Sequence, residues 1–156
     1  MARAELEPAI GPGASLLLDS SAILAYLDGT ESISVLAAVI LDEFIATGRN
    51  RAIMSAVSVT DALVRPFRAG SASAAGTVEA FLRSFPNLSI APVTYEIARE
   101  AARIRAATAI RTPDALILAT TTVVGSDIVV ANDDRWQGAI ERAGLAVRLC
   151  HLEAFI

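Results

Sequence analysis

Short apolar runs alternate with helical patterns along most of the chain. Apolar runs that fit strands lie at residues 15–18, 52–55, 88–91, 128–131 and 146–149. Apolar positions three and four apart predict helices in the stretches 20–27, 32–48, 59–67, 77–85, 94–109, 113–124 and 134–143. Strands that alternate with helices favour a mostly parallel sheet covered on both faces. The expected fold class is therefore α/β, with three layers in the order α/β/α.

Two stretches lack these patterns and are predicted to be loose. One is the N-terminal segment through Gly13, and the other is the small-residue segment AGSASAAG at 69–76. Neither separates two segments that are large enough to be domains. For a chain of 156 residues, we expect an N-terminal tail over residues 1–14 and a single domain over residues 15–156.

The composition favours a soluble, cytoplasmic protein. Apolar residues make up 54% of the chain, yet no stretch of about 18 consecutive apolar residues exists. The first residues also lack the apolar core of a signal peptide and carry Glu5 and Glu7. The net charge of −4 argues against nonspecific capture of nucleic acid by a broad basic face.

The rare residues limit the possible chemistry more than the common ones do. The chain has no lysine, which excludes Schiff-base catalysis and the phosphate-binding lysine of a P-loop. It has one histidine, His151, so a site with several histidine ligands is impossible. Its one cysteine, Cys150, lies in an apolar segment and is predicted to be a packed thiol. Any chemistry must come from carboxylates, hydroxyls and arginines.

Four aspartates lie at or near predicted helix starts: Asp19, Asp61, Asp114 and Asp133, with Asp134 competing for the last place. Each alone is most simply explained as a helix cap that complements the helix dipole. In a parallel sheet, however, these starts share one edge, where gathered carboxylates repel each other unless arginine or a divalent cation offsets them. A site that offers only oxygen ligands favours Mg²⁺ or Mn²⁺. Such an ion commonly catalyses the hydrolysis of a phosphodiester.

The blocks that carry these aspartates resemble the PIN-domain family, specifically the VapC-type ribonuclease toxins of toxin–antitoxin pairs. The likeness runs from about Ser15 to Leu149 and rests on four blocks in order: LLLDSSAILAYLDG, SVTDALVRPFRAG, RTPDALILATT and GSDIVVANDDRW. It implies a PIN-like fold and a cytoplasmic, Mg²⁺- or Mn²⁺-dependent endoribonuclease that leaves 5′-phosphate and 3′-hydroxyl ends. It also implies a homodimer, and a VapB-type antitoxin that inserts an arginine among the carboxylates.

The resemblance assigns a role to each aspartate. Asp19, Asp61, Asp114 and Asp133 would be the first to fourth acids of the metal site, and Asp61 would position or deprotonate the attacking water. The chain departs from the family at Asp61, where glutamate is more common, and at Ala131, where threonine or serine is frequent. These departures support the alternative of a catalytically weakened PIN-like domain that acts as a binding scaffold.

Several neighbouring residues receive weaker predictions. Ser21 is predicted to bond near the metal or to cap its helix, and Asn132 to substitute partly for the hydroxyl that Ala131 lacks. Arg111 is a candidate phosphate contact, and Trp136 is predicted to pack against the sheet. An aspartate-phosphorylated receiver fits the α/β pattern but needs a lysine, and the corresponding phosphatases need an acid where this chain has Ser21.

Overall fold

A computed structural model describes residues 2–156 and contains one parallel sheet of five strands in the order β3-β2-β1-β4-β5. Each neighbouring pair of strands is parallel. The strands are β1 (Leu16–Leu18), β2 (Ala52–Ser55), β3 (Leu88–Ala91), β4 (Ile128–Ala131) and β5 (Arg148–His151). The predicted α/β class and the parallel sheet are confirmed.

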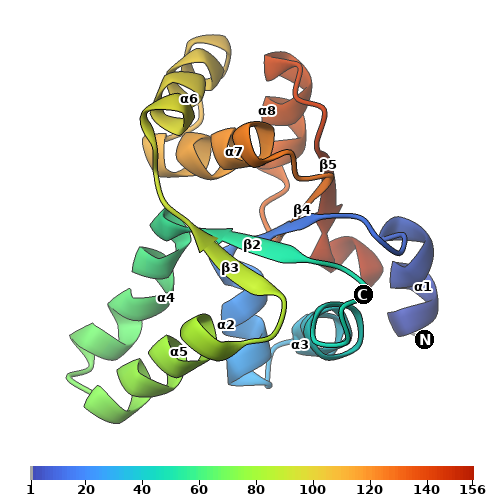
Figure 1. Ribbon diagram of the computed structural model, residues 1–156, viewed down its shortest axis with the longest axis vertical. Coiled ribbons are helices and arrows are strands. Elements are labelled where there is room, and N and C mark those ends of the chain that lie inside the picture. The colour runs from blue at the N-terminus through green and yellow to red at the C-terminus, as the bar shows by residue number, and fades with distance from the viewer. Residues whose placement is uncertain (1) are drawn as a thin grey trace.

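Helices cover both faces of this sheet (Figure 1). The helices on one side are α6 (Tyr95–Ala107), α7 (Thr112–Val124) and α8 (Arg135–Ala143). Those on the other side are α1 (Ala2–Ala9), α2 (Ser20–Asp28), α3 (Ser34–Ala38), α4 (Ala56–Arg68) and α5 (Ala72–Ser84). A π-helical segment, Val39–Ile45, continues α3, and a short 3-10 turn, Leu152–Phe155, follows β5.

Alternation along the strands produces two separate apolar cores. In β1, Leu16 and Leu18 pack into the core beneath α1, α2 and α3, while Leu17 packs into the core beneath α6, α7 and α8. All three side chains are fully buried, as expected for a central strand with helices on both faces. None of the helices within residues 2–156 combines the length and apolar character that crossing a bilayer requires.

The prediction of a loose segment through Gly13 is wrong, because much of this segment is the helix α1. Leu6 on this helix and Ile10 just after its end lie four residues apart, and both are fully buried in the core. On the exposed side, Arg3 forms ion pairs with Glu7 of the same helix at 3.0 Å and with Glu43 of the π-helical segment at 2.6 Å. Two apolar positions are too few to establish a helical period among nearby glycines and prolines.

Two other boundaries differ from the prediction. The segment 69–76 is not a loose connection, because α5 begins at Ala72 and the Ser71 hydroxyl caps it by accepting a hydrogen bond from the Ala74 N–H at 3.1 Å. Alanine is the best helix former, so a run of small residues continues the helix once it is capped. The last strand spans Arg148–His151, two residues beyond the predicted position.

Asp127 joins the starts of β1 and β4, and its contribution to stability is expected to depend on pH. Its Oδ2 accepts hydrogen bonds from the Ser15 N–H at 2.8 Å and the Ser15 hydroxyl at 3.0 Å, which lower the pKa of the carboxyl. A lowered folded pKa means that this stabilisation is present above the ordinary value of 3.8 and is lost as the pH falls through the folded value. Asp127→Ala should therefore reduce the free energy of unfolding at pH 7 by less than about 1 kcal/mol, because the carboxylate is exposed. Urea titrations at pH 7 and pH 2.5 measure this, and an equal loss at both values contradicts it.

Candidate functional site

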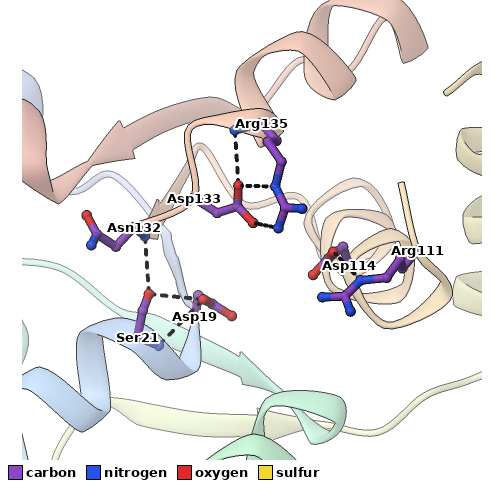
Figure 2. A network of polar contacts seen from close by, with 7 residues as sticks. All are labelled: Asp19, Ser21, Arg111, Asp114, Asn132, Asp133 and Arg135. Carbon is purple, nitrogen blue, oxygen red and sulfur yellow. Dashed lines mark hydrogen bonds and ion pairs between the residues drawn. The ribbon is translucent and has the colours of Figure 1, made fainter. Parts of the chain in front are cut away.

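Asp19 lies at the carboxyl end of β1 and caps α2. Its Oδ2 accepts hydrogen bonds from the Ser21 hydroxyl at 3.0 Å and from the Ser21 N–H at 3.5 Å. The Ser21 hydroxyl in turn accepts one from the Asn132 N–H at 3.2 Å, so a relay connects the ends of β1 and β4 (Figure 2). The cap of α2 is Asp19 and not Ser21, which lies within the first turn of the helix and fixes the orientation of the Asp19 carboxylate. A role of Ser21 near a metal stays a prediction.

Burial is the main influence on the Asp19 carboxyl. It raises the pKa, while the hydrogen bonds from the Ser21 hydroxyl and from the backbone of Ser20 and Ser21 lower it. The negative charge of Asp61 adds a further rise. A carboxylate that is kept from water beside another acid is destabilised in its charged form, so a cation placed here would stabilise it.

Asp61 lies in the second turn of α4, not in the first turn as predicted. The helix begins at Ala56, earlier than the apolar pattern indicates, because the Ser55 hydroxyl caps it by accepting a hydrogen bond from the Val57 N–H at 3.2 Å. Capping therefore does not explain Asp61. The side chain is exposed, yet its charge raises the pKa of both Asp19 and Asp114, as the smallest of the influences on each.

Asp114 occupies the first turn of α7. The cap position is Arg111, which makes no side-chain capping bond, and Pro113 follows within the first turn. Partial burial raises the pKa of Asp114; the Arg111 guanidinium opposes this rise, and the charges of Asp133 and Asp61 add to it. The only ion pair of Asp114 within residues 2–156 is a long one, 4.0 Å from Oδ2 to Arg111 Nε. Its negative charge is only partly compensated.

Asp133 follows β4 and is held by Arg135. Its Oδ1 accepts hydrogen bonds from the Arg135 N–H at 3.0 Å and Nε–H at 2.9 Å, and its Oδ2 accepts one from Nη2–H at 2.6 Å. These contacts lower the pKa of Asp133 and keep the carboxyl ionised. The competing residue, Asp134, is exposed and precedes α8 without a side-chain capping bond.

The four aspartates therefore lie near one another at the carboxyl edge of the sheet. Figure 2 shows Asp19 at the start of α2 directly after β1, Asp114 in the first turn of α7, and Asp133 in the turn after β4. The charge of Asp61 raises the pKa of Asp19 and Asp114, and the charge of Asp133 raises the pKa of Asp114. Their convergence is incomplete, since no three histidine, cysteine or acidic side chains in residues 2–156 form a group able to hold a metal ion.

The donor chemistry nevertheless fits a hard divalent cation. The ligand atoms available at this edge are carboxylate oxygens, which Mg²⁺ and Mn²⁺ prefer. Both hydrogen bonds from Ser21 to the Asp19 carboxylate go to Oδ2. Arg135 occupies both oxygens of Asp133, so it competes with a metal ion for this carboxylate.

Other predicted residues prove to have structural roles. The Asn132 side chain does not substitute for a hydroxyl at the site, because its Nδ2 donates to Glu153 Oε1 at 2.9 Å and its Oδ1 accepts from the Glu153 N–H at 3.1 Å. Cys150 is a buried thiol whose pKa is raised to about 11 by burial, which makes it a poor nucleophile. Trp136 is buried in the core beneath α6, α7 and α8, as predicted.

Arg135 was missed by the sequence analysis. Its position two residues after Asp133 and at the start of α8 is the only local signal of the pairing. An arginine two residues after an aspartate is common in proteins, so this spacing does not predict an ion pair unless the geometry of the loop is known.

Comparison with known proteins identifies the family. A model of the PIN domain matches residues 16–141, and the chain belongs to the PIN-domain family. A search of curated proteins finds no match. Solved structures with the same fold include Mycobacterium tuberculosis VapC20, described as a Sarcin-Ricin loop cleaving toxin, at 16% identity and a TM-score of 0.65, covering 80% of this chain and 94% of that one.

Two further structures with this fold contain complexes. VapBC2 from Rickettsia felis, bound to a DNA fragment from its promoter, matches at 12% identity and a TM-score of 0.69, covering 88% of this chain and 98% of that one. A toxin–antitoxin complex from Klebsiella pneumoniae matches at 16% identity and a TM-score of 0.59, covering 76% and 86%. At these identities the likeness establishes the fold alone.

Proposed function

We propose that this PIN-domain protein is a divalent-metal-dependent endoribonuclease of the VapC type. The observation that carries the proposal is the placement of Asp19. Its carboxylate is largely kept from water, aimed by the Ser21 relay, and lies close to the charge of Asp61. A helix cap does not need a second acid that destabilises its charge, whereas a metal ligand does benefit from one. Membership of the PIN family supports the same conclusion.

We assign the four aspartates two roles, metal binding and positioning of the attacking water. Asp19 and Asp114 would hold Mg²⁺ or Mn²⁺, with Asp61 and Asp133 completing the site. When bound, the ion supplies a more acidic water and neutralises charge on the phosphate oxygens. Asp61, the most exposed of the four acids, would position the attacking water or accept its proton. The products would carry 5′-phosphate and 3′-hydroxyl ends.

We further propose that the chain acts as one PIN-like domain in the cytoplasm, with α1 as part of it because Leu6 and Ile10 pack into its core. We also propose that a VapB-type antitoxin neutralises the enzyme. A chain of the same fold was solved in a toxin–antitoxin complex. The Asp133–Arg135 pair supports the inhibitory mode implied for this family, because a guanidinium already binds one of the four acids here. A homodimer is the proposed assembly.

Metal dependence is the direct test of the proposed activity. Purified protein free of any antitoxin should cleave single-stranded RNA in the presence of Mn²⁺, lose this cleavage in excess EDTA, and regain it when Mn²⁺ is added back. Gel electrophoresis of a labelled RNA, with end analysis of the fragments, measures both rate and product chemistry. Cleavage at the same rate with and without EDTA would contradict a metal-dependent nuclease.

A second candidate function is a catalytically weakened PIN-like scaffold. It is favoured by the occupation of both Asp133 oxygens by Arg135 and by the absence of a hydroxyl at Ala131. Calorimetric titration with Mn²⁺ separates the two functions. A nuclease site should bind the ion with measurable heat at millimolar concentration or below, whereas a scaffold without a metal site should give none.

A further inference from the structure

A cleft of about 450 Å³ lies beside the acidic edge, between the start of α7 and the exposed side of α8. Asp114 belongs to both the cleft and the acidic edge, so a ligand in the cleft would extend directly to the proposed metal site. The cleft is within the size range of small-molecule sites and is larger than a phosphate group alone requires. Ile110 and Trp136 contribute apolar walls.

Three guanidinium groups line this cleft, from Arg111, Arg135 and Arg142. Arg135 is engaged by Asp133, and Arg111 has its long contact with Asp114. Arg142 makes no ion pair with any residue from 2 to 156, and its Nη2 lies against Gly138, 3.6 Å from the point where a Cβ would stand. Glycine is a poor choice inside a helix, and here it leaves the backbone open beside this guanidinium. The cleft is also lined by Asp114 and Asp134, so three arginines against two aspartates leave a net charge of +1 on its lining.

Trp136 gives a second, independent indication of a ligand. The side chain is only 2% exposed, and its indole Nε1 is buried without any hydrogen-bond acceptor among residues 2–156. Buried donors without a partner are rare in folded proteins, because the donor loses water and gains nothing in return. Trp136 also lines the cleft, so a ligand that fills the cleft changes the surroundings of its indole.

We propose that the cleft holds one nucleotide of the RNA strand next to the cleaved bond. Its phosphate would lie between Arg142 and Arg111, and its sugar or base would lie against Ile110 and Trp136. Arginine is well suited to phosphate because its planar group presents several donors at once. That the ligand is RNA rests on the proposed function; the cleft itself and its charges do not.

The single tryptophan makes this proposal directly measurable. The full chain, labelled with ¹⁵N and kept in EDTA to prevent cleavage, is titrated with a single-stranded octaribonucleotide while the indole N–H resonance is followed. A saturable shift of this resonance is expected. Arg142→Gln should weaken binding about five- to tenfold and reduce the salt dependence of log K by about 0.7, the value for one lost phosphate contact on a single strand.

Arg83→Gln is the matched control, because Arg83 lies on α5, on the other side of the sheet, and is also an exposed arginine. It should leave the affinity unchanged. Adenosine 5′-monophosphate should move the indole resonance at lower concentration than inorganic phosphate does. The proposal is overturned if Arg142→Gln behaves like Arg83→Gln, if RNA binds without moving the indole, or if phosphate alone binds as well as the nucleotide.

The test also separates this proposal from the proposed function. If the indole titration succeeds while Mn²⁺ supports no RNA cleavage, the nucleotide cleft stands and the nuclease assignment fails. If cleavage is metal-dependent but Arg142→Gln has no effect on binding, the nuclease assignment stands and the cleft does not take the RNA.

Discussion

The Asp19→Asn variant is expected to lose RNA cleavage by about two to three orders of magnitude and yet to unfold at a higher temperature than the natural protein. Asparagine keeps the shape of the side chain and is an equally good helix cap, so α2 should remain intact. What it removes is a charge that burial and Asp61 destabilise, as the raised pKa of Asp19 indicates. Function and stability should therefore change in opposite directions, as is common for residues selected for activity.

Cleavage rates and melting temperatures, measured with and without Mn²⁺, check this prediction. Mn²⁺ should raise the melting temperature of the natural protein, because a ligand of the folded state stabilises it, and should not do so for Asp19→Asn. Asp28→Asn removes an exposed carboxylate at the end of α2 and serves as the control, with unchanged cleavage and an unchanged response to Mn²⁺. Full cleavage by Asp19→Asn would mean that this residue is a helix cap and nothing more.

The sheet could be predicted from sequence because each strand carries a local signal. β2, β3 and β4 begin and end where the apolar runs do. In β1, Leu17 faces one core and its neighbours Leu16 and Leu18 face the other, so an apolar run without polar positions indicates burial on both faces of the sheet. The helix α1 could not be predicted in this way, because its stability comes from contacts across the fold. Leu6 and Ile10 are buried against elements far along the chain, and short helices depend on such packing rather than on propensity.

The site was predictable to a similar degree. Because the carboxyl ends of parallel strands share one edge, the chain positions of Asp19 and Asp133 predict that they lie near each other. The shared edge does not, however, predict the hydrogen bonds and ion pairs that set the charge state of these two carboxyls. Ser21 meets the backbone of Asn132 across 111 residues, and the turn after β4 brings Arg135 back onto Asp133. Both are properties of the folded loops, without a period or a spacing that a sequence could display.

Asp133→Asn is expected to weaken Mn²⁺ binding about tenfold, whereas Asp134→Asn should change it less than twofold. The two substitutions remove the same charge from adjacent residues, so the comparison isolates position. Asp133 raises the pKa of Asp114, which shows that its charge acts on the acidic edge. Asp134 is exposed and lines the neighbouring cleft instead. Isothermal titration with Mn²⁺ measures both affinities under one set of conditions.

Arg135→Gln completes this comparison, because it removes the cation that holds both Asp133 oxygens. Binding of Mn²⁺ should tighten about tenfold, since a repelling charge is lost and Asp133 becomes available as a ligand. In this variant the Asp133→Asn substitution should then have a larger effect on Mn²⁺ affinity than it has in the natural protein. If Asp133→Asn and Asp134→Asn weaken binding equally, only the net charge of the region matters and Asp133 is not a ligand. If Arg135→Gln leaves the affinity unchanged, the arginine does not compete with the metal, and its pairing with Asp133 only orders the turn after β4.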